Sequence, residues 1–223
     1  MSELVPALKN TLFSSTLEVF SEYAELGIDA LLESEALKEI PVVNTITAIC
    51  KTGYNLRERS FIKQTLTFIS EFNSGSIPQE KLDEHRERLD ANPKDAEKEL
   101  SRVLIILGNQ IDETQSKVLG SFYASYVKGA ISWGKFCELA EANRRMFVSD
   151  YALLFEAANN DGLKIQGREL YQVDRLISLG LLQNKNRLSG DVCIEATDSS
   201  EKQNDVIVTS LEKTFFYNAP DAL

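Results

Sequence analysis

Apolar residues recur at intervals of three and four along most of the chain, which is the spacing of one face of an α-helix. The first such stretch runs from Leu4 to Leu32. The next runs from Pro41 to Phe72, where the proline suits the first turn of a helix because that turn does not need its N–H. Further helices are predicted over 79–89, from Pro93 to Leu107, after Asp112 and after Ser132, the last either continuing through Met146 or breaking near 149–150.

The pattern changes after the turn sequence Asn159-Asn160-Asp161-Gly162, which we interpret as a domain boundary. A helix is predicted from Gly167 to Leu179, with Gly180 as its left-handed C-terminal residue. Two stretches, 187–197 and 205–211, then alternate apolar and polar residues as a β-hairpin does. The sequence therefore predicts a mostly α fold: a multi-helix bundle over 1–158, a small α+β winged-helix-like module with a hairpin over 161–217, and a frayed tail over 218–223.

The first 35 residues are expected to form a helix that extends from this bundle. Their apolar stripe is broad and includes Leu12, Phe13, Leu17 and Phe20. A stripe of this width must be buried against something. The sequence leaves open whether it packs within its own chain or against another, which makes self-association one expectation.

Composition limits the classes of partner. The chain has 34 acidic and 24 basic residues and a net charge of −10, which disfavours non-specific binding to nucleic acid or to anionic membranes. The N-terminus lacks the basic region and apolar core of a secretory signal. The most apolar run, Ile40 to Cys50, has about half the length of a membrane-spanning helix. We therefore predict a cytoplasmic protein whose membrane contact is at most peripheral.

Residues able to carry catalysis are sparse. His85 is the only histidine, and its neighbours Glu84 and Arg86 predict a solvent-exposed position on a charged helix. Cys50, Cys137 and Cys193 lie far apart and form no metal-binding motif. Phosphate-binding and nucleophile motifs are absent from the sequence. We predict no catalytic residue, metal site, cofactor or small-molecule substrate, hence no enzyme, although 34 acidic residues leave a carboxylate-based activity as the alternative.

Two groups of polar residues are candidate interaction sites. The first is a basic cluster of Lys51, Arg57, Arg59 and Lys63. It is either a binding surface or part of the bundle interior, where Arg57 or Arg59 would form an ion pair with Asp112 or Glu113. The second comprises Arg168, Gln172 and Arg175, which would contact DNA if the C-terminal module read it as a winged helix does. Residues 161–223 hold ten acidic and seven basic side chains, however, and this balance favours docking to protein instead.

Three stretches together resemble a loose group of uncharacterised helical bacterial proteins, often of accessory or prophage-derived gene content. They are Ile40-Pro41-Val42-Val43 with the basic helix from Lys51 to Lys63, the segment 112–154 with Lys117, Tyr126 and Ile131-Ser132, and the helix end 176–182 with the hairpin. The resemblance covers most of the chain after residue 38 and implies no known activity or cofactor. It suggests a role in phage–host conflict or its regulation.

The expected function is a non-enzymatic interaction or regulatory protein that docks a protein partner or a second copy of itself. One alternative is a winged-helix transcriptional regulator that contacts DNA through Arg168 and Arg175. The other is peripheral membrane association through the segment from Ile40 to Phe72, which has an apolar start and a basic continuation.

Overall fold

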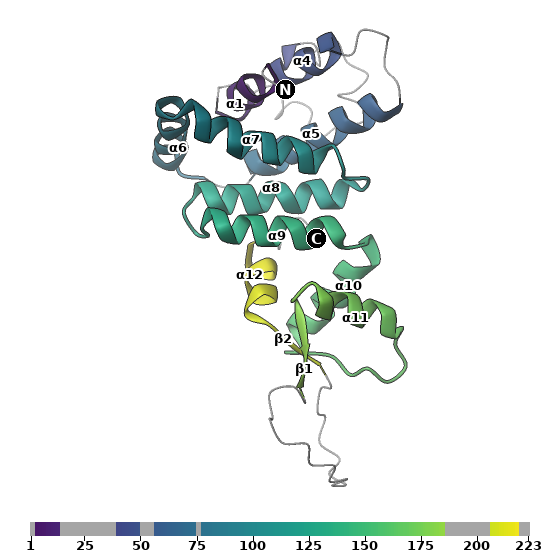
Figure 1. Cartoon of the computed structure of the whole chain (residues 1–223). Helices are drawn as coiled ribbons and strands as arrows, with labels where there is room; N and C mark the ends of the chain where they lie inside the picture. The colour runs from purple at the N-terminus through teal and green to yellow at the C-terminus, as the bar shows by residue number, and fades with distance from the viewer. Residues whose placement is uncertain (1–2, 14–38, 50–55, 75–76, 186–205, 219–223) are drawn as a thin grey trace, which may run out of the picture. The chain divides into compact units, whose positions relative to one another are not determined.

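The computed structural model describes residues 3–13, 39–49, 56–74, 77–185 and 206–218 (Figure 1). Within these ranges it contains ten helices and two short strands, which confirms the prediction of a mostly helical chain. The described residues form two compact units that divide between Arg144 and Arg145. The turn at 159–162 is present, with positive φ at Asp161 (53°) and Gly162 (139°), but it lies inside the second unit.

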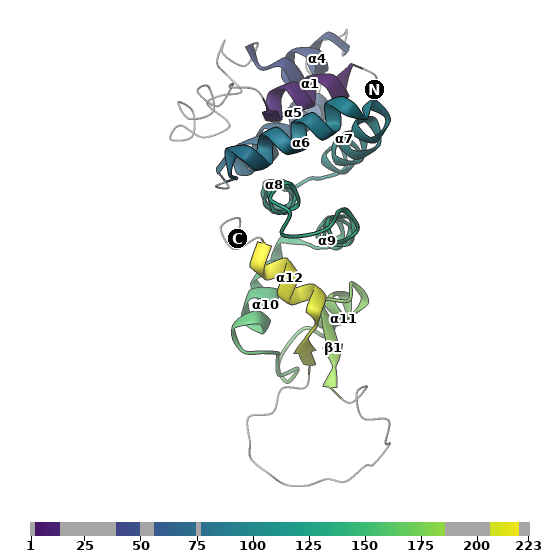
Figure 2. The same cartoon turned by 90° about the vertical axis from the view of Figure 1, so that its left-hand side faces the viewer.

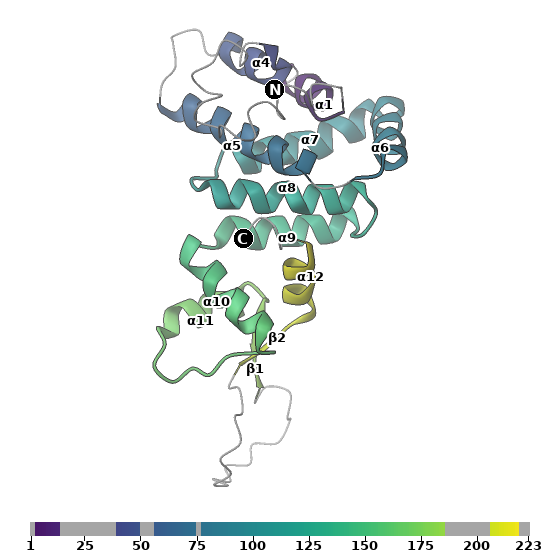
Figure 3. The same ribbon diagram turned by 180° about the vertical axis from the view of Figure 1, so that it is seen from behind.

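The first unit is built from helices stacked in layers (Figures 1 and 3). Short α1 and α4 lie side by side and cover the longer helices, while α8 and α9 form an antiparallel pair. Local signals set several helix starts as expected: Pro93 occupies the first turn of α7, and the Ser132 hydroxyl accepts a hydrogen bond from the Lys135 N–H at 3.2 Å. The helices are α1 (Leu4–Phe13), α4 (Pro41–Ile49), α5 (Leu56–Ser74), α6 (Gln79–Ala91), α7 (Pro93–Leu107), α8 (Glu113–Val127) and α9 (Trp133–Arg145).

The core of the first unit lies where α5 crosses α8. Phe68 and Phe72 of α5 and Phe122 and Tyr123 of α8 are fully buried there. The two backbones approach closely at Gly120, because a Cβ at that position would lie 2.7 Å from the Phe68 carbonyl oxygen. Only glycine fits such a contact without displacing a backbone.

The second unit comprises α10 (Val148–Asn159), α11 (Leu170–Ser178), β1 (Leu182–Asn184), β2 (Val206–Val208) and α12 (Ser210–Asn218). The strands pair antiparallel, with Leu182 opposite Val208 and Asn184 opposite Val206. Gly180 has a φ of 75°, which confirms its predicted left-handed role at the end of α11. A buried core forms where Phe215 of α12 lies against Tyr151 of α10, with ring centroids 6.4 Å apart.

Several predicted boundaries differ from the structure. The first predicted hairpin strand, 187–197, and the tail after residue 218 lie outside the described residues, as do 14–32 of the long first helix and 50–55 of the second. β1 forms between the predicted end of the helix at Gly180 and the first predicted strand, which was expected to begin at residue 187. The predicted strand 205–211 stops at Val208, because the Thr209 hydroxyl accepts a hydrogen bond from the Glu212 N–H at 3.1 Å and so caps α12. Among the described helices, none has the length and apolar character needed to cross a bilayer.

Replacing Gly120 with alanine tests the close contact of α5 and α8. The added Cβ would also lie 2.9 Å from the Glu71 Cβ, so we expect Gly120→Ala to lower the free energy of unfolding by about 1–3 kcal/mol. The control is Gly134→Ala, where the nearest atom lies 3.9 Å away and alanine should be neutral or stabilising by about 0.5–1 kcal/mol. Denaturant titration followed by fluorescence of Trp133 measures both. Equal stability of the two variants would contradict the contact.

Candidate functional site

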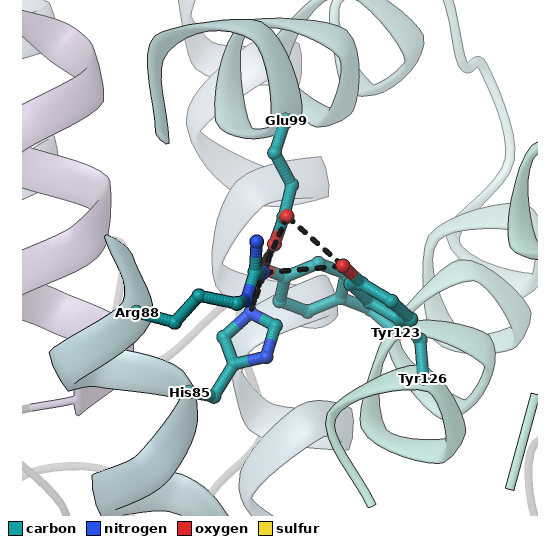
Figure 4. A network of polar contacts seen from close by, with 5 residues as sticks. All are labelled: His85, Arg88, Glu99, Tyr123 and Tyr126. Atoms are coloured by element: carbon teal, nitrogen blue, oxygen red, sulfur yellow. Dashed lines mark hydrogen bonds and ion pairs between the residues drawn. The ribbon is translucent and has the colours of Figure 1, made fainter. Parts of the chain in front are cut away.

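A cluster of five polar side chains joins three helices in the first unit (Figure 4). His85 and Arg88 come from α6, Glu99 from α7, and Tyr123 and Tyr126 from α8. The side chains of Glu99 and His85 are only 6% and 7% exposed, whereas that of Arg88 is 39% exposed. We call these five residues the Glu99 network.

The Glu99 carboxylate accepts hydrogen bonds from every other member of the network. His85 Nε2 and the Tyr123 hydroxyl lie 2.9 and 2.8 Å from its Oε1. Arg88 and the Tyr126 hydroxyl lie 2.6 and 3.1 Å from its Oε2. A carboxylate has about four lone-pair sites, so this one is saturated. It has no acceptor position left for a metal ion or a substrate proton.

The protonation states fit this pattern of donors and acceptor. Burial opposes ionisation of Glu99, but the hydrogen bonds from His85 and Arg88 outweigh it and lower the pKa of Glu99. Burial and the negative charge of Glu99 raise the pKa of Tyr126 to about 12, and they raise that of Tyr123 well above its ordinary value. At neutral pH the network therefore contains an ionised carboxylate and two neutral phenols that donate to it.

The prediction that His85 is solvent-exposed is wrong. His85 lies on the same face of α6 as Leu89, and these are the two buried residues of that helix. Its ring stacks on Phe13 of α1, with centroids 5.6 Å apart and an angle of 26° between the planes. The charged neighbours of His85 in the sequence point to other faces of the helix, because adjacent residues are about 100° apart around the axis.

A groove of about 540 Å³ lies beside the network, between α7 and α9. Figure 2 looks nearly along α8 and α9 and shows α7 and α9 displaced to the same side of α8. One wall is a face of α7, formed by residues that recur every three or four positions. The other wall is a face of α9. The lining residues are Lys98, Ser101, Arg102, Ile105 and Ile106 on α7, Asn109 in the turn that follows it, and Trp133, Glu141 and Arg144 on α9. We call this hollow the α7–α9 groove.

The positive charges of the groove are of two kinds. Arg144 is paired with Glu141 at 2.8 Å. Lys98 and Arg102 are exposed and form no ion pair with any residue in the described ranges. Together with Lys94 they occur every four residues, so they form a basic stripe along one face of α7. The stripe faces toward α9, since two of its members, Lys98 and Arg102, line the groove together with Trp133 and Glu141 of α9.

The Glu99 network holds both walls of the groove. The hydrogen bonds of Glu99 fix the buried face of α7. Glu99 lies between Lys98 and Arg102 in the sequence. Tyr126 contacts Trp133 with ring centroids 5.3 Å apart, and Trp133 stacks on Phe136 at 5.0 Å. The walls are therefore fixed by buried contacts before any ligand binds.

The basic cluster predicted from the sequence is only partly assembled. Lys51 lies outside the described residues. Lys63 forms the ion pair with Glu113, at 2.7 Å, that was expected of Arg57 or Arg59. Arg57 and Arg59 are exposed and make no ion pair within the described part of the chain, and Arg57 borders a smaller hollow of about 290 Å³.

The three residues predicted to contact DNA already contact other side chains within the second unit. Arg175 forms two hydrogen bonds to Asp150, at 2.7 and 2.8 Å, and its guanidinium lies 4.3 Å from the centre of the Phe147 ring. Arg168 donates to both carboxylate oxygens of Glu156. The Gln172 side chain lies 3.5 Å from the Ser149 hydroxyl.

Sequence reasoning missed both the Glu99 network and the α7–α9 groove. The repeat Lys94, Lys98, Arg102 on one helix face was the available signal for the groove. No comparable signal pointed to Glu99, whose partners lie 11 to 27 residues away. In the ranges that the structure describes, no group of three or more His, Cys, Asp or Glu residues is arranged to hold a metal ion.

Comparisons of the chain with protein-family models, with characterised proteins and with solved structures gave no match. The resemblance to uncharacterised bacterial proteins therefore stays a prediction, and function has to be argued from the residues themselves.

Replacing Glu99 tests the network. We expect Glu99→Gln to lower the free energy of unfolding by about 3 kcal/mol at neutral pH, because His85 and Arg88 lose a buried anionic partner. Since the pKa of Glu99 is lowered on folding from its ordinary 4.5, this stabilisation is present above about pH 4.5 and is lost as the pH falls through the folded-state value. The difference between the two proteins should therefore shrink in acid. Trp133 fluorescence in denaturant measures it, and Glu97→Gln on the exposed face of α7 is the control.

Arg168 and Arg175 of the second unit should differ sharply in the stability lost on substitution. Arg175→Met leaves the carboxylate of Asp150, which is 0% exposed, without its cationic partner, and should cost about 3 kcal/mol. Arg168→Met breaks an exposed pair and should cost less than about 1 kcal/mol. Hydrogen exchange of the α10 and α11 amides measures both costs. Equal costs would show that the buried pair is no more important than the exposed one.

Proposed function

We propose that this protein is a non-catalytic binding module whose α7–α9 groove receives an acidic amphipathic helix of a partner protein. The observation that carries the proposal is the presence of Lys98 and Arg102, without an ion-pair partner in the described ranges, beside the apolar side chains of Ile105 and Trp133. The chain as a whole carries a net charge of −10. A concentrated positive stripe on such a protein favours a negatively charged partner.

The cost of the basic stripe supports a binding role. Like charges four residues apart on a helix repel each other and destabilise it by a few tenths of a kcal/mol. A partner that places carboxylates one turn apart removes this repulsion and forms charge-assisted hydrogen bonds. The partner's carboxylates would lie over Lys98 and Arg102.

The shape of the groove favours a helix as the ligand. The α7 wall from Lys98 to Ile106 rises about 12 Å at 1.5 Å per residue, which matches just over two turns of a partner helix. Ile105 is 51% exposed, and tryptophan and arginine are the residue types that most often contribute binding energy at interfaces. Apolar residues of the partner would cover Ile105 and Trp133 between the two walls.

The contacts already made elsewhere support binding in preference to the other activities considered. Glu99 has no free acceptor position for acid–base chemistry. DNA contact through Arg168 or Arg175 would require breaking their ion pairs. Val42, Val43 and Ile46, the apolar start of the segment considered for membrane binding, are buried in the first unit. A role in phage–host conflict is compatible with a binding module, and it would make the partner a phage or host protein.

Selection from a phage-displayed library of random 16-residue peptides tests the ligand chemistry on the full chain. We expect enriched peptides to carry acidic residues three or four apart, with apolar residues on the opposite face. A synthetic copy of one such peptide should lose at least about ten-fold in affinity for the double variant Lys98→Glu/Arg102→Glu, which corresponds to about 1.4 kcal/mol. Fluorescence anisotropy measures the affinity.

The matched control is Arg57→Glu/Arg59→Glu, which makes the same charge change at an exposed basic pair on α5. It should leave peptide affinity within about two-fold, and circular dichroism should show both double variants folded. Loss of binding in the control alone would place the site on α5 and overturn the groove. Enrichment of basic peptides, or of none, would also contradict the proposal. A peptide matching this chain's own sequence would identify a second copy as the partner.

A further inference from the structure

Glu212 is a buried carboxylic acid in the first turn of α12. Glu212 is 1% exposed, and its Oε1 atom has no hydrogen-bond partner among the residues that the structure describes. Buried carboxyl groups without a partner are rare, because ionisation in an apolar surrounding is costly. This one is a feature of the second unit alone and is independent of the groove.

The local sequence would ordinarily give Glu212 a capping role. Thr209 and Glu212 have the spacing of a capping box, in which the glutamate accepts a hydrogen bond from the threonine N–H. Here the Thr209 N–H donates instead to the Leu181 carbonyl oxygen at 3.1 Å, beside the β1–β2 pair. Only half of the box forms, and the carboxyl group of Glu212 is left in the interior.

Two charged side chains act on this carboxyl group among the described residues. Lys213 lies next to it on α12, and Asp161 belongs to the turn that follows α10. Lys213 and Asp161 are 3.7 Å apart and largely exposed, so each partly cancels the effect of the other on Glu212. Neither provides a hydrogen bond that would stabilise an ionised Glu212 inside the unit.

We propose that α12 is a proton-controlled latch, docked on α10 while Glu212 is protonated and released when Glu212 loses its proton. The docked state buries Phe215 against Tyr151 and brings Phe216 to 5.4 Å from Phe155. An ionised Glu212 reaches water only if the first turn of α12 moves out of the core, and that movement carries the rest of this short helix with it. Release exposes the face of α10 that α12 covers.

The direction of the pH dependence follows from burial. Burial raises the pKa of Glu212 from its ordinary 4.5 to about 7, with Lys213 lowering it and Asp161 raising it. A group whose pKa is higher in the docked state than in the released state stabilises the docked state. This stabilisation is complete at pH values below the released-state pKa. The stabilisation is lost as the pH rises through about 7. The latch is therefore closed in mild acid and opens through neutral pH.

Amide hydrogen exchange of α12 in the full chain tests the latch. For a pKa of about 7 when docked and 4.5 when released, the opening equilibrium rises about ten-fold between about pH 6 and pH 8. Protection factors, corrected for the intrinsic exchange rate at each pH, should fall by that factor in α12. Amides of α8 in the first unit should keep theirs. In Glu212→Gln, which is neutral at both values, α12 protection should change by less than about two-fold.

Asp174→Asn, which neutralises an exposed acid of the same unit, is the matched control and should retain the ten-fold change. Asp161→Asn should move the transition to lower pH, because it removes a charge that opposes ionisation of Glu212. This second variant keeps the test decisive if Glu212→Gln does not fold. Equal pH dependence in the parent protein and Glu212→Gln, or constant α12 protection from pH 6 to 8 in the parent, would overturn the latch.

Discussion

The first unit depends on one buried negative charge, the carboxylate of Glu99. A lone carboxylate in a protein interior is strongly unfavourable, so the chain must bring donors to it. Those donors come from α6 and α8, and Glu99 itself belongs to α7. Helix α6 buries only His85 and Leu89, which is too little apolar surface to fix its position. The hydrogen bonds to Glu99 therefore fix α6, and Phe13 of α1 packs on the histidine that they orient.

Helix α7, which carries Glu99, presents opposite charges on its inner and outer faces. The inner face of α7 carries Glu99, whose charge is matched by Arg88, and the outer face carries the basic stripe. Because the inner contacts are saturated, the positions of Lys98 and Arg102 are set without any help from a partner. A binding surface whose backbone is already ordered loses less entropy when a ligand binds, so weak individual contacts suffice for a specific complex.

The fold was predictable from sequence where the determining signals were local. Pro93, Ser132 and Gly180 set helix ends through their own backbone and side-chain chemistry, and the structure places these ends as expected. The prediction that His85 is exposed was wrong because it relied on the charged neighbours of His85 and not on its spacing from Leu89. No local pattern indicated its partner Glu99, which is 14 residues away. The pairing of Leu182 with Val208 joins distant segments, so no local pattern indicates β1. The start of α12 was predictable in principle, since Thr209 and Glu212 have the spacing of a capping box.

The close contact at Gly120 limits how far the first unit can yield when a ligand enters the groove. Backbone atoms of α5 and α8 touch there, so sliding one helix along the other would force atoms to overlap. Helix α9 meets α8 through the rings of Trp133 and Phe136 against Tyr126, and through buried hydrogen bonds in which the Asn143 side chain donates to the Gln115 carbonyl oxygen at 2.8 Å and the Gln115 side chain donates to the Asn143 carbonyl oxygen at 3.3 Å. Displacing α9 would leave these buried polar groups without partners, which is costly. Both walls therefore keep their register, and a bulky ligand has to adapt its own side chains to the groove.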